Sequence, residues 1–199
     1  MFTGEWVDYK DQSHIRFKCG YCGVDTSPSK GWRSTNTNGI IGYVLICTSC
    51  NQPSFVIASG TNVTTTTPSP KLGNEVQGLP DEILHLYDEA RSCSSIKAYT
   101  SVVLTCRKIL MHIAVNKGAS EGMSFIKYID FLGENGFIPP DGREWIDHIR
   151  SKANEANHEI KIMDKVEAEN LLVFTEMLLR LIYEFPSRLT QKIEEININ

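Results

Sequence analysis

The sequence predicts an α+β protein, with a small β-rich segment first and an all-α bundle after it. Three observations support this prediction. Residues 1–58 carry two C-x-x-C pairs among short β-branched runs, residues 59–79 are rich in Thr, Pro and Gly, and from residue 80 onward apolar residues recur at helical spacing. The 199 residues, of which 41% are hydrophobic, suffice for one substantial core and a small accessory domain. We expect a β domain over 1–58, a linker over 59–79 and a bundle over 80–199.

Alternating and β-branched residues predict three strands in the first part, over 14–18, 40–46 and 54–58. A domain of about 58 residues buries too little apolar surface to be stable without help. This part therefore needs a further source of stability.

The cysteines provide that source. Cys19 and Cys22 form one C-x-x-C pair, and Cys47 and Cys50 form a second pair after 24 intervening residues. Four thiolates at this spacing can close a tetrahedral zinc site, as in a zinc ribbon. Four protein ligands leave no position for water, so the predicted Zn²⁺ is structural. Two disulfides, which a cytosolic protein disfavours, and a redox-active pair are the alternatives.

Residues near the cysteines add to this prediction. Gly20 and Gly23 are expected to let the first pair turn tightly, and His14 could serve as an alternative ligand. Between the pairs lies a polar loop with Trp32 and Arg33. An exposed aromatic ring beside a cation could stack on a base or contact a partner protein, although Trp32 could also simply cover the ribbon.

Five amphipathic helices make up the expected antiparallel bundle. The first begins at Pro80, and the last begins at Asp164 with a capping box to Glu167 and is expected to end at Pro186. Ile96 is expected inside the second helix. The second to fifth helices are expected over 95–117, 123–133, 141–160 and 164–185.

A row of polar residues marks the fourth of these helices. Arg150, Asn154 and His158 follow one another every four residues along the edge of an apolar stripe. A guanidinium, an amide and an imidazole in one row could join neighbouring helices by hydrogen bonds or could face a ligand phosphate. The residues alone leave both interpretations open.

Short motifs of the bundle resemble the domain-of-unknown-function family DUF4145. They are a Glu-Ala pair in a Pro-led acidic first helix, here Glu89 and Ala90, an apolar run that is followed by Arg107, and a segment from Ile149 to His158 similar to the family's Ile-Arg-x-x-Gly-Asn-x-x-x-His signature. Members often carry an N-terminal zinc ribbon, so the resemblance covers nearly the whole chain. That family is similar in turn to the HEPN superfamily of helical bundles, which implies a HEPN-like bundle and a place in prokaryotic defence, restriction or toxin systems.

Many HEPN members are metal-independent ribonucleases whose Arg and His meet across a homodimer interface. The resemblance therefore implies a homodimer, with His158, Arg150 and Asn154 as candidate catalytic residues. A histidine can move the proton of a ribose 2′-hydroxyl while an arginine binds the phosphate. This sequence departs from the pattern, because seven residues separate Arg150 from His158, Lys152 lies nearer, and Ala153 replaces the glycine.

Charge and hydropathy exclude two classes of protein. The net charge is −4, and residues 59–199 carry fifteen Lys and Arg against twenty Asp and Glu, unlike a strongly basic nucleic-acid binder, although this bulk charge leaves a basic patch on one face open. The sequence has no apolar run of about 18 residues and no basic region followed by an apolar one at its start. We expect a cytoplasmic protein without a membrane partner.

Three functions follow, in order of preference. The first is a non-catalytic zinc-binding interaction module of a prokaryotic or phage defence or restriction system, which recognises a protein or an RNA or DNA partner. The second is a metal-independent endoribonuclease that uses His158 with Arg150 or Lys152. The third is a sensor of a nucleotide or other small ligand. The candidate binding residues are Trp32, Arg33, Lys152 and Arg107, although an ion pair with a bundle acid such as Glu176 would also explain Arg107.

Overall fold

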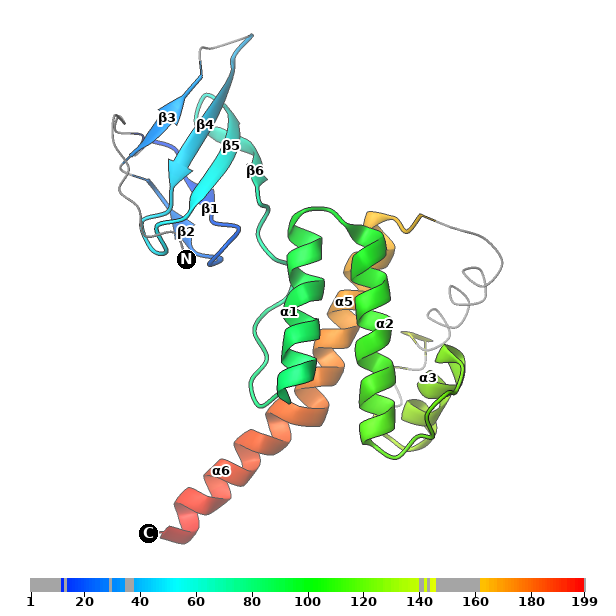
Figure 1. The fold of residues 1–199 in the computed structure, drawn as a ribbon. Coiled ribbons are helices and arrows are strands. Elements are labelled where there is room, and N and C mark those ends of the chain that lie inside the picture. The colour runs from blue at the N-terminus through cyan, green and yellow to red at the C-terminus, as the bar shows by residue number, and fades with distance from the viewer. Residues whose placement is uncertain are drawn as a thin grey trace. The chain divides into compact units, whose positions relative to one another are not determined.

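The computed structural model describes residues 12, 14–28, 30–34, 38–139, 142, 144–145 and 162–198 (Figure 1). The chain divides into two compact units, residues 1–71 and 72–199. The first unit contains the strands and the second contains the helices, which confirms the predicted α+β class.

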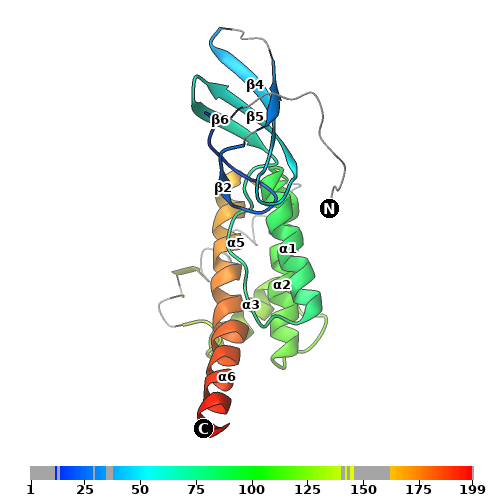
Figure 2. The ribbon, with the colours of Figure 1, turned by 90° about the vertical axis from the view of Figure 1, so that its left-hand side faces the viewer.

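Two antiparallel sheets form the first unit. A small sheet pairs β1 (Phe17–Lys18) with β2 (Asp25–Thr26). The larger sheet contains β3 (Gly31–Arg33), β4 (Ile40–Ile46), β5 (Pro53–Ser59) and β6 (Asn62–Thr67) in chain order, and Figure 2 shows β4, β5 and β6 side by side. Two predicted strands are confirmed as β4 and β5, whereas only the last two residues of the range 14–18 form a strand.

The linker expected over 59–79 contains ordered structure. Residues 62–67 form β6, which pairs with β5, and the boundary between the two units falls between Lys71 and Leu72. The physical reason is that threonine is β-branched and favours an extended backbone as well as being polar. A Thr-rich run can therefore form an edge strand.

One face of the larger sheet covers the core of the first unit. Tyr43 and Leu45 alternate along β4, Val56 and Ala58 alternate along β5, and all four side chains are buried. Ile15, Phe17 and the cysteines Cys19 and Cys47 complete this cluster. The core is small, and two of its members are candidate metal ligands.

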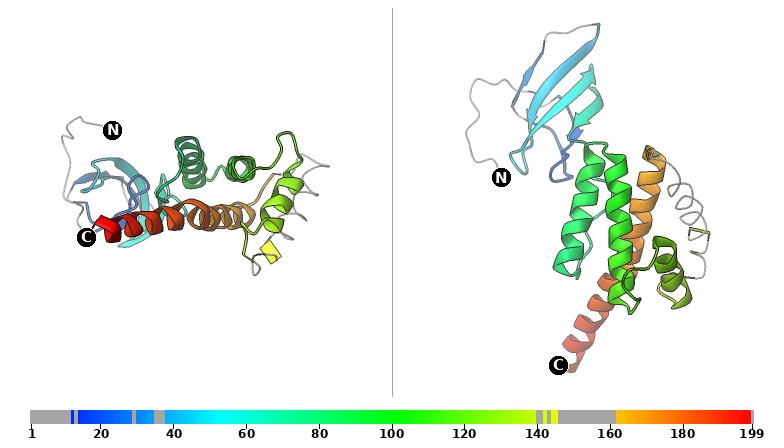
Figure 3. Two further views of the ribbon diagram at one scale, coloured as in Figure 1. Left: turned by 90° about the horizontal axis from the view of Figure 1, so that it is seen from below. Right: turned by 45° about the vertical axis from the view of Figure 1, so that its right-hand side comes forward.

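The second unit is a bundle with a larger apolar core. Its elements are α1 (Asp81–Ser95), α2 (Tyr99–Asn116), α3 (Phe125–Glu134), α5 (Lys165–Leu179), the π-helix η2 (Arg180–Glu184) and α6 (Phe185–Ile198). The helix α2 packs against α1, α3 and α5, and Figures 1 and 3 show α1, α2 and α5 side by side with α3 at one end of α2. In the part of the chain that the structure describes, none of the helices is both long enough and apolar enough to span a bilayer.

Four of the five expected helices are present. The first begins after Pro80, as predicted, and the Asp164 side chain accepts a hydrogen bond from the Glu167 amide at 2.8 Å, which confirms the N-cap of α5. The fifth expected helix, over 141–160, lies outside the described residues except for positions 142, 144 and 145.

The predicted end of the last helix at Pro186 is wrong, because the helix continues through Pro186 to Ile198. Proline cannot donate a backbone hydrogen bond, and in an α-helix its ring clashes with the carbonyl four residues earlier. Here the turn before it is the π-helix η2, in which the Phe185 amide donates to the Arg180 carbonyl. The wider π turn accommodates the proline and lets the chain continue as α6.

Residues 72–79 connect to α1 as an extended segment, which we call the strap. Val76 of the strap is buried in the bundle core, and Leu72 and Leu79 pack against the same core. The strap is therefore an integral part of the second unit.

Candidate metal centre and contact surfaces

The two C-x-x-C turns share one backbone geometry. The Gly23 amide donates to the Cys19 carbonyl at 2.9 Å, and the Asn51 amide donates to the Cys47 carbonyl at 3.0 Å. Gly23 and Asn51 each follow the second cysteine of their pair, and both have positive φ angles, 71° and 57°. Glycine and asparagine are the residues that adopt this conformation most readily. The repeated geometry aims the four sulfurs at a common point.

The sulfur positions fit a tetrahedral metal site. The Sγ atoms of Cys19 and Cys50 lie 3.7 Å apart, as do those of Cys22 and Cys47, and all four lie within 4.8 Å of one another. Four sulfurs at about 2.3 Å from a central Zn²⁺ are separated by about 3.8 Å in a regular tetrahedron. The four cysteines are therefore suited to hold a metal ion such as Zn²⁺, and all are free thiols.

Burial and hydrogen bonds shift the pKa values of the thiols of Cys19, Cys22 and Cys50. Burial raises the pKa of the Cys50 thiol to about 12 and also raises the pKa of Cys19. Burial acts in the same direction on Cys22, but the amide of Val24 and the neighbouring thiols outweigh it and lower the pKa. A divalent cation at the centre would stabilise the thiolate form of every member. The Tyr21 amide, 3.4 Å from the Cys19 sulfur, adds a donor that stabilises the same charge.

Tight packing around the first turn explains Gly20. A Cβ atom at this position would lie 2.0 Å from the carbonyl oxygen of Pro68, a backbone atom that cannot move away freely. The glycine that the turn itself requires is Gly23, because Gly20 has no positive φ angle. The hydroxyls of Thr26 and Thr48, 2.7 Å apart, add a further link beside the two turns.

His14 is not part of the metal cluster. Among the described residues, the histidine, cysteine and acidic side chains that gather closely enough to bind an ion are the four cysteines alone. The imidazole of His14 packs edge-on against Tyr43, with 6.3 Å between the ring centroids.

The outer face of the larger sheet carries an apolar row. Trp32 of β3 pairs with Val44 of β4, which pairs with Phe55 of β5, so these side chains lie on one face. Phe55 is 47% exposed, and its ring lies over Gly42, where a Cβ atom would be 3.3 Å from it. We call Trp32, Val44, Phe55 and the neighbouring Ile57 the sheet patch.

The strand register places Trp32 and Arg33 on opposite faces of β3. Trp32 belongs to the sheet patch, whereas Arg33 pairs with the buried Tyr43 and lies on the opposite side of β3. Trp32 is half-buried and Arg33 is exposed. The structure therefore does not bring this aromatic ring and this cation together on one surface.

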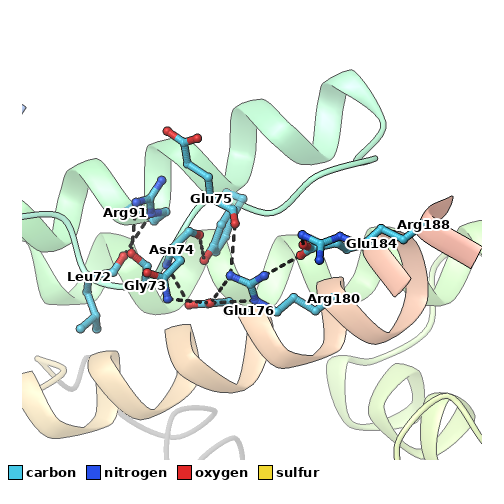
Figure 4. A network of polar contacts seen from close by, with 10 residues as sticks. Leu72, Gly73, Asn74, Glu75, Arg91, Glu176, Arg180, Glu184 and Arg188 are labelled. Carbon is cyan, nitrogen blue, oxygen red and sulfur yellow. Dashed lines mark hydrogen bonds and ion pairs between the residues drawn. The ribbon is translucent and has the colours of Figure 1, made fainter. Parts of the chain in front are cut away.

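The strap is fixed to the bundle by a polar network (Figure 4). The carbonyl oxygens of four successive residues, 72–75, each accept a hydrogen bond from a side chain of the bundle. Arg91 donates to the first two at 3.1 Å each, Tyr87 to the third at 2.9 Å and Arg180 to the fourth at 3.1 Å. The network thus joins the strap to α1 and to the π-helix.

Glu176 lies at the centre of this network. It accepts hydrogen bonds from the Asn74 amide at 3.0 Å and from the Nη2 atom of Arg180 at 2.9 Å. Burial alone would raise the pKa of Glu176, but the bonds from Arg180 and Asn74 outweigh it and lower the pKa. Arg180 also pairs with the buried Glu184 at 2.6 Å, and Glu184 pairs in turn with Arg188. The acids and bases satisfy one another, so the arrangement is structural.

Comparison with known protein families gives a match to the helical part of the chain. Residues 88–197 match the family described as Domain of unknown function (DUF4145), and the match covers more than half of the 199 residues. The chain belongs to this family. Neither the curated proteins nor the solved structures give a match to the chain.

The DUF4145 match extends from the middle of α1 to the last turn of α6. Within it, the guanidinium of Arg107 lies over the ring of Phe125, 4.3 Å from the centroid, and burial lowers its pKa. Its contact is thus a ring rather than the expected Glu176, whose carboxylate binds Arg180 and Asn74.

The remaining candidates of the DUF4145 domain lie outside the described residues. These are Arg150, Lys152, Asn154 and His158, together with the signature that contains them. The predictions that they act in catalysis or binding stay predictions.

Sequence reasoning missed the network of the strap, although one signal was present. Glu176, Arg180, Glu184 and Arg188 alternate in charge every four residues, which is the spacing of ion pairs along a helix. The carbonyl acceptors carry no such signal, because any residue supplies a backbone oxygen.

Proposed function

We propose that this DUF4145 protein is a non-catalytic zinc-binding interaction module whose first unit binds a protein partner through the sheet patch. The observation that carries the proposal is the continuous row of Trp32, Val44 and Phe55 across three strands of the same unit that contains the four-cysteine site. A site closed by four thiolates supports a fold and offers no position for a substrate. The metal would therefore hold the sheet rigid while the patch makes the contact.

The chemistry of the patch favours a protein over a nucleic acid. Its members are apolar, with a tryptophan and a phenylalanine, the residue types that are enriched where proteins bind one another. Phosphate binding would call for a cluster of cations. Arg33 lies on the other side of β3, away from the patch.

The likeness to HEPN proteins indicates where to look for the partner. It suggests a prokaryotic or phage defence or restriction system, in which the zinc-bearing unit recognises another component. The endoribonuclease alternative rests on His158 with Arg150 or Lys152, which lie outside the described residues.

The experiment compares tagged wild-type protein with Phe55→Asp in capture of partners from cells of the source organism. We expect Phe55→Asp to lose the partner, because the ring belongs to the patch and is 47% exposed, and a charge there opposes an apolar contact. The matched control is Leu84→Asp on α1, where the side chain is 43% exposed and remote in sequence from the sheet. Both variants should bind zinc at the wild-type level.

Two results would contradict the proposal. Equal capture of the partner by Phe55→Asp and wild type would show that the sheet patch does not bind the partner. Cleavage of RNA in magnesium-free buffer, with 2′,3′-cyclic ends and loss of activity in His158→Ala, would establish the ribonuclease in place of a non-catalytic module.

A further inference from the structure

The larger sheet of the first unit ends at β3. The strand order is β3-β4-β5-β6, so β3 has a neighbouring strand on one side only, and Figure 1 shows it as an outermost strand. The Ser34 amide donates to the Gly42 carbonyl at 2.8 Å, and the Ser34 hydroxyl accepts from the Gly42 amide at 3.0 Å. These bonds hold the end of β3 against β4, so the outer edge of the sheet is formed before any partner binds.

The backbone of Arg33 faces this outer edge. In an antiparallel pair, successive residues direct their N–H and C=O groups alternately toward and away from the neighbouring strand. The Ser34 amide faces β4, and so does the Lys30 carbonyl, which accepts from the Ile46 amide at 3.4 Å. Gly31 and Arg33 hold the alternate positions, so their backbone groups point away from β4. Of the two, Gly31 is buried and Arg33 is exposed, so a partner can reach the edge at Arg33.

The exposed part of this edge has backbone groups to offer. Among the described residues, the amide and the carbonyl of Arg33 have no hydrogen-bond partner. An open strand edge of this kind is a template for a further strand, because one extended residue can accept from the amide and donate to the carbonyl. The backbone therefore indicates an extended polypeptide segment as the occupant.

The side chains beside the edge indicate which residues this segment carries. On one face of β3, Trp32 borders the edge as a member of the sheet patch. On the other face, the Arg33 guanidinium is exposed and forms no ion pair with the described residues. The described part of the first unit contains a single acid, Asp25, which lies opposite Lys18 in the small sheet. An added strand would thus meet an apolar ring on one face and a cation without a counter-charge on the other.

We propose that the protein partner of the sheet patch supplies an extended segment that adds to β3 as a fifth strand of the larger sheet. The inference rests on the proposed function and names the form that its partner takes. One residue of the segment exchanges two backbone hydrogen bonds with Arg33, and its acidic side chain pairs with the guanidinium. The next residue is apolar and packs beside Trp32. In such complexes the backbone bonds give affinity and the alternating side chains give specificity.

The test uses a displayed library of short random peptides, selected on the full-length, zinc-loaded chain. The dissociation constants of the selected peptides are then measured for each variant. Arg33→Pro removes the outward amide and leaves the bonds between β3 and β4 in place, and proline is tolerated at such edge positions. We expect it to weaken binding at least about tenfold. The matched control is Arg33→Ala, which keeps the amide and should weaken binding only about threefold through the lost ion pair.

Two further readouts use the same peptides. In the wild-type complex the Arg33 amide should exchange its hydrogen at least about tenfold more slowly, whereas the Ser34 amide, already bonded to Gly42, should change little. The selected peptides should carry Asp or Glu next to an apolar residue, and selection on Arg33→Glu should replace the acid with Lys or Arg. Exchange in the wild type needs no variant, so it decides the question even if Arg33→Pro fails to fold.

Three results would overturn the inference. They are a selection that yields no peptide, peptides that bind Arg33→Pro as tightly as wild type, and an Arg33 amide whose exchange the peptides leave unchanged. Phe55→Asp separates this failure from that of the proposed function. Peptides that Phe55→Asp loses and Arg33→Pro keeps would retain the sheet patch and exclude the added strand. Peptides that Arg33→Pro loses and Phe55→Asp keeps would retain the added strand and exclude the patch, and peptides that bind both variants would exclude both.

Discussion

The two units solve the problem of stability in different ways. The first unit has a small core in which Cys19 and Cys47, two of the four candidate metal ligands, are themselves members. The second unit has a larger core that the strap closes, and the charges of its polar network neutralise one another. We therefore expect the stability of the first unit to depend on a bound metal ion and the second unit to fold without one.

Metal removal is the strongest way to test this difference. A structural Zn²⁺ contributes about 10–16 kcal/mol of apparent binding free energy, which in a small domain is folding free energy. We expect a chelator to abolish the dispersed amide signals of residues 14–67 in an NMR spectrum while the helical circular dichroism and its thermal midpoint stay near their original values. Metal analysis should give one zinc per chain before treatment.

Two cysteine variants provide the matched comparison. Cys22→Ser removes a ligand and should reproduce the effect of the chelator, because three thiolates bind zinc far more weakly. Cys93→Ser alters a half-buried thiol of the bundle and should leave both the zinc content and the first unit unchanged. A first unit that keeps its spectrum in excess chelator would refute the dependence on metal.

Substitutions of the two glycines of the first turn test why the first unit needs each of them. Gly20→Ala places a Cβ atom 2.0 Å from the Pro68 carbonyl, and we expect it to destabilise the first unit by about 3 kcal/mol. Gly23→Asn should cost less than about 1 kcal/mol, because Asn51 occupies the equivalent place in the second turn with a φ angle of 57°. The measurement is the chelator concentration at which each variant loses zinc, and equal values for both would contradict the assignment.

These glycines also show what sequence can and cannot predict. The four cysteines were identified from spacing alone, because a metal site made of two turns imposes a local pattern on the chain. The need for Gly20 arises from Pro68, which is distant in sequence, so no local pattern records it. The equivalent residue of the second turn is Thr48, which confirms that the turn itself does not require glycine there.

In the second unit, local rules failed where one element changes into another. Ile96 was expected inside a helix that begins at residue 95, but α2 begins at Tyr99 and Ile96 is 65% exposed. Pro186 was expected to end a helix, but the residues before it form a π-helix, in which the Phe185 amide donates to the Arg180 carbonyl, and the chain continues as α6. The starts of α1 and α5 and both ends of α3 were predicted to within two residues, because the caps and the apolar spacing there are regular.

The polar network should contribute less to the free energy of unfolding than the metal does. Its contribution depends on pH. Glu176→Gln removes one of the two carboxylates that Arg180 contacts and leaves Glu184 as the other, and we expect it to destabilise the bundle by about 2 kcal/mol at pH 7. The pKa of Glu176 is lowered in the folded state, so its stabilisation is complete above the ordinary glutamate pKa and is lost as the pH falls through the folded value. The gap between wild type and variant in urea unfolding should therefore narrow toward pH 3.

A surface ion pair of the same helix serves as the control for this effect. Glu169 pairs with Lys165 at 3.6 Å, and their side chains are 40% and 64% exposed. Glu169→Gln should change the unfolding free energy by less than about 0.5 kcal/mol. A difference for Glu176→Gln that stays constant from pH 7 to pH 3 would show that the network does not depend on the charge of this residue.

The smallest expected effect concerns Arg107, and it separates a packing role from a binding role. Its guanidinium lies 4.3 Å from the centroid of Phe125 and is half-buried, a geometry in which a cation and a ring attract each other by about 1 kcal/mol. We expect Arg107→Lys and Phe125→Leu each to destabilise the bundle, and the double variant to cost less than the sum of the two. A double-mutant cycle in urea unfolding measures this coupling. If the costs are simply additive, the ring does not hold the arginine, and Arg107 returns to the candidates for contact with a ligand.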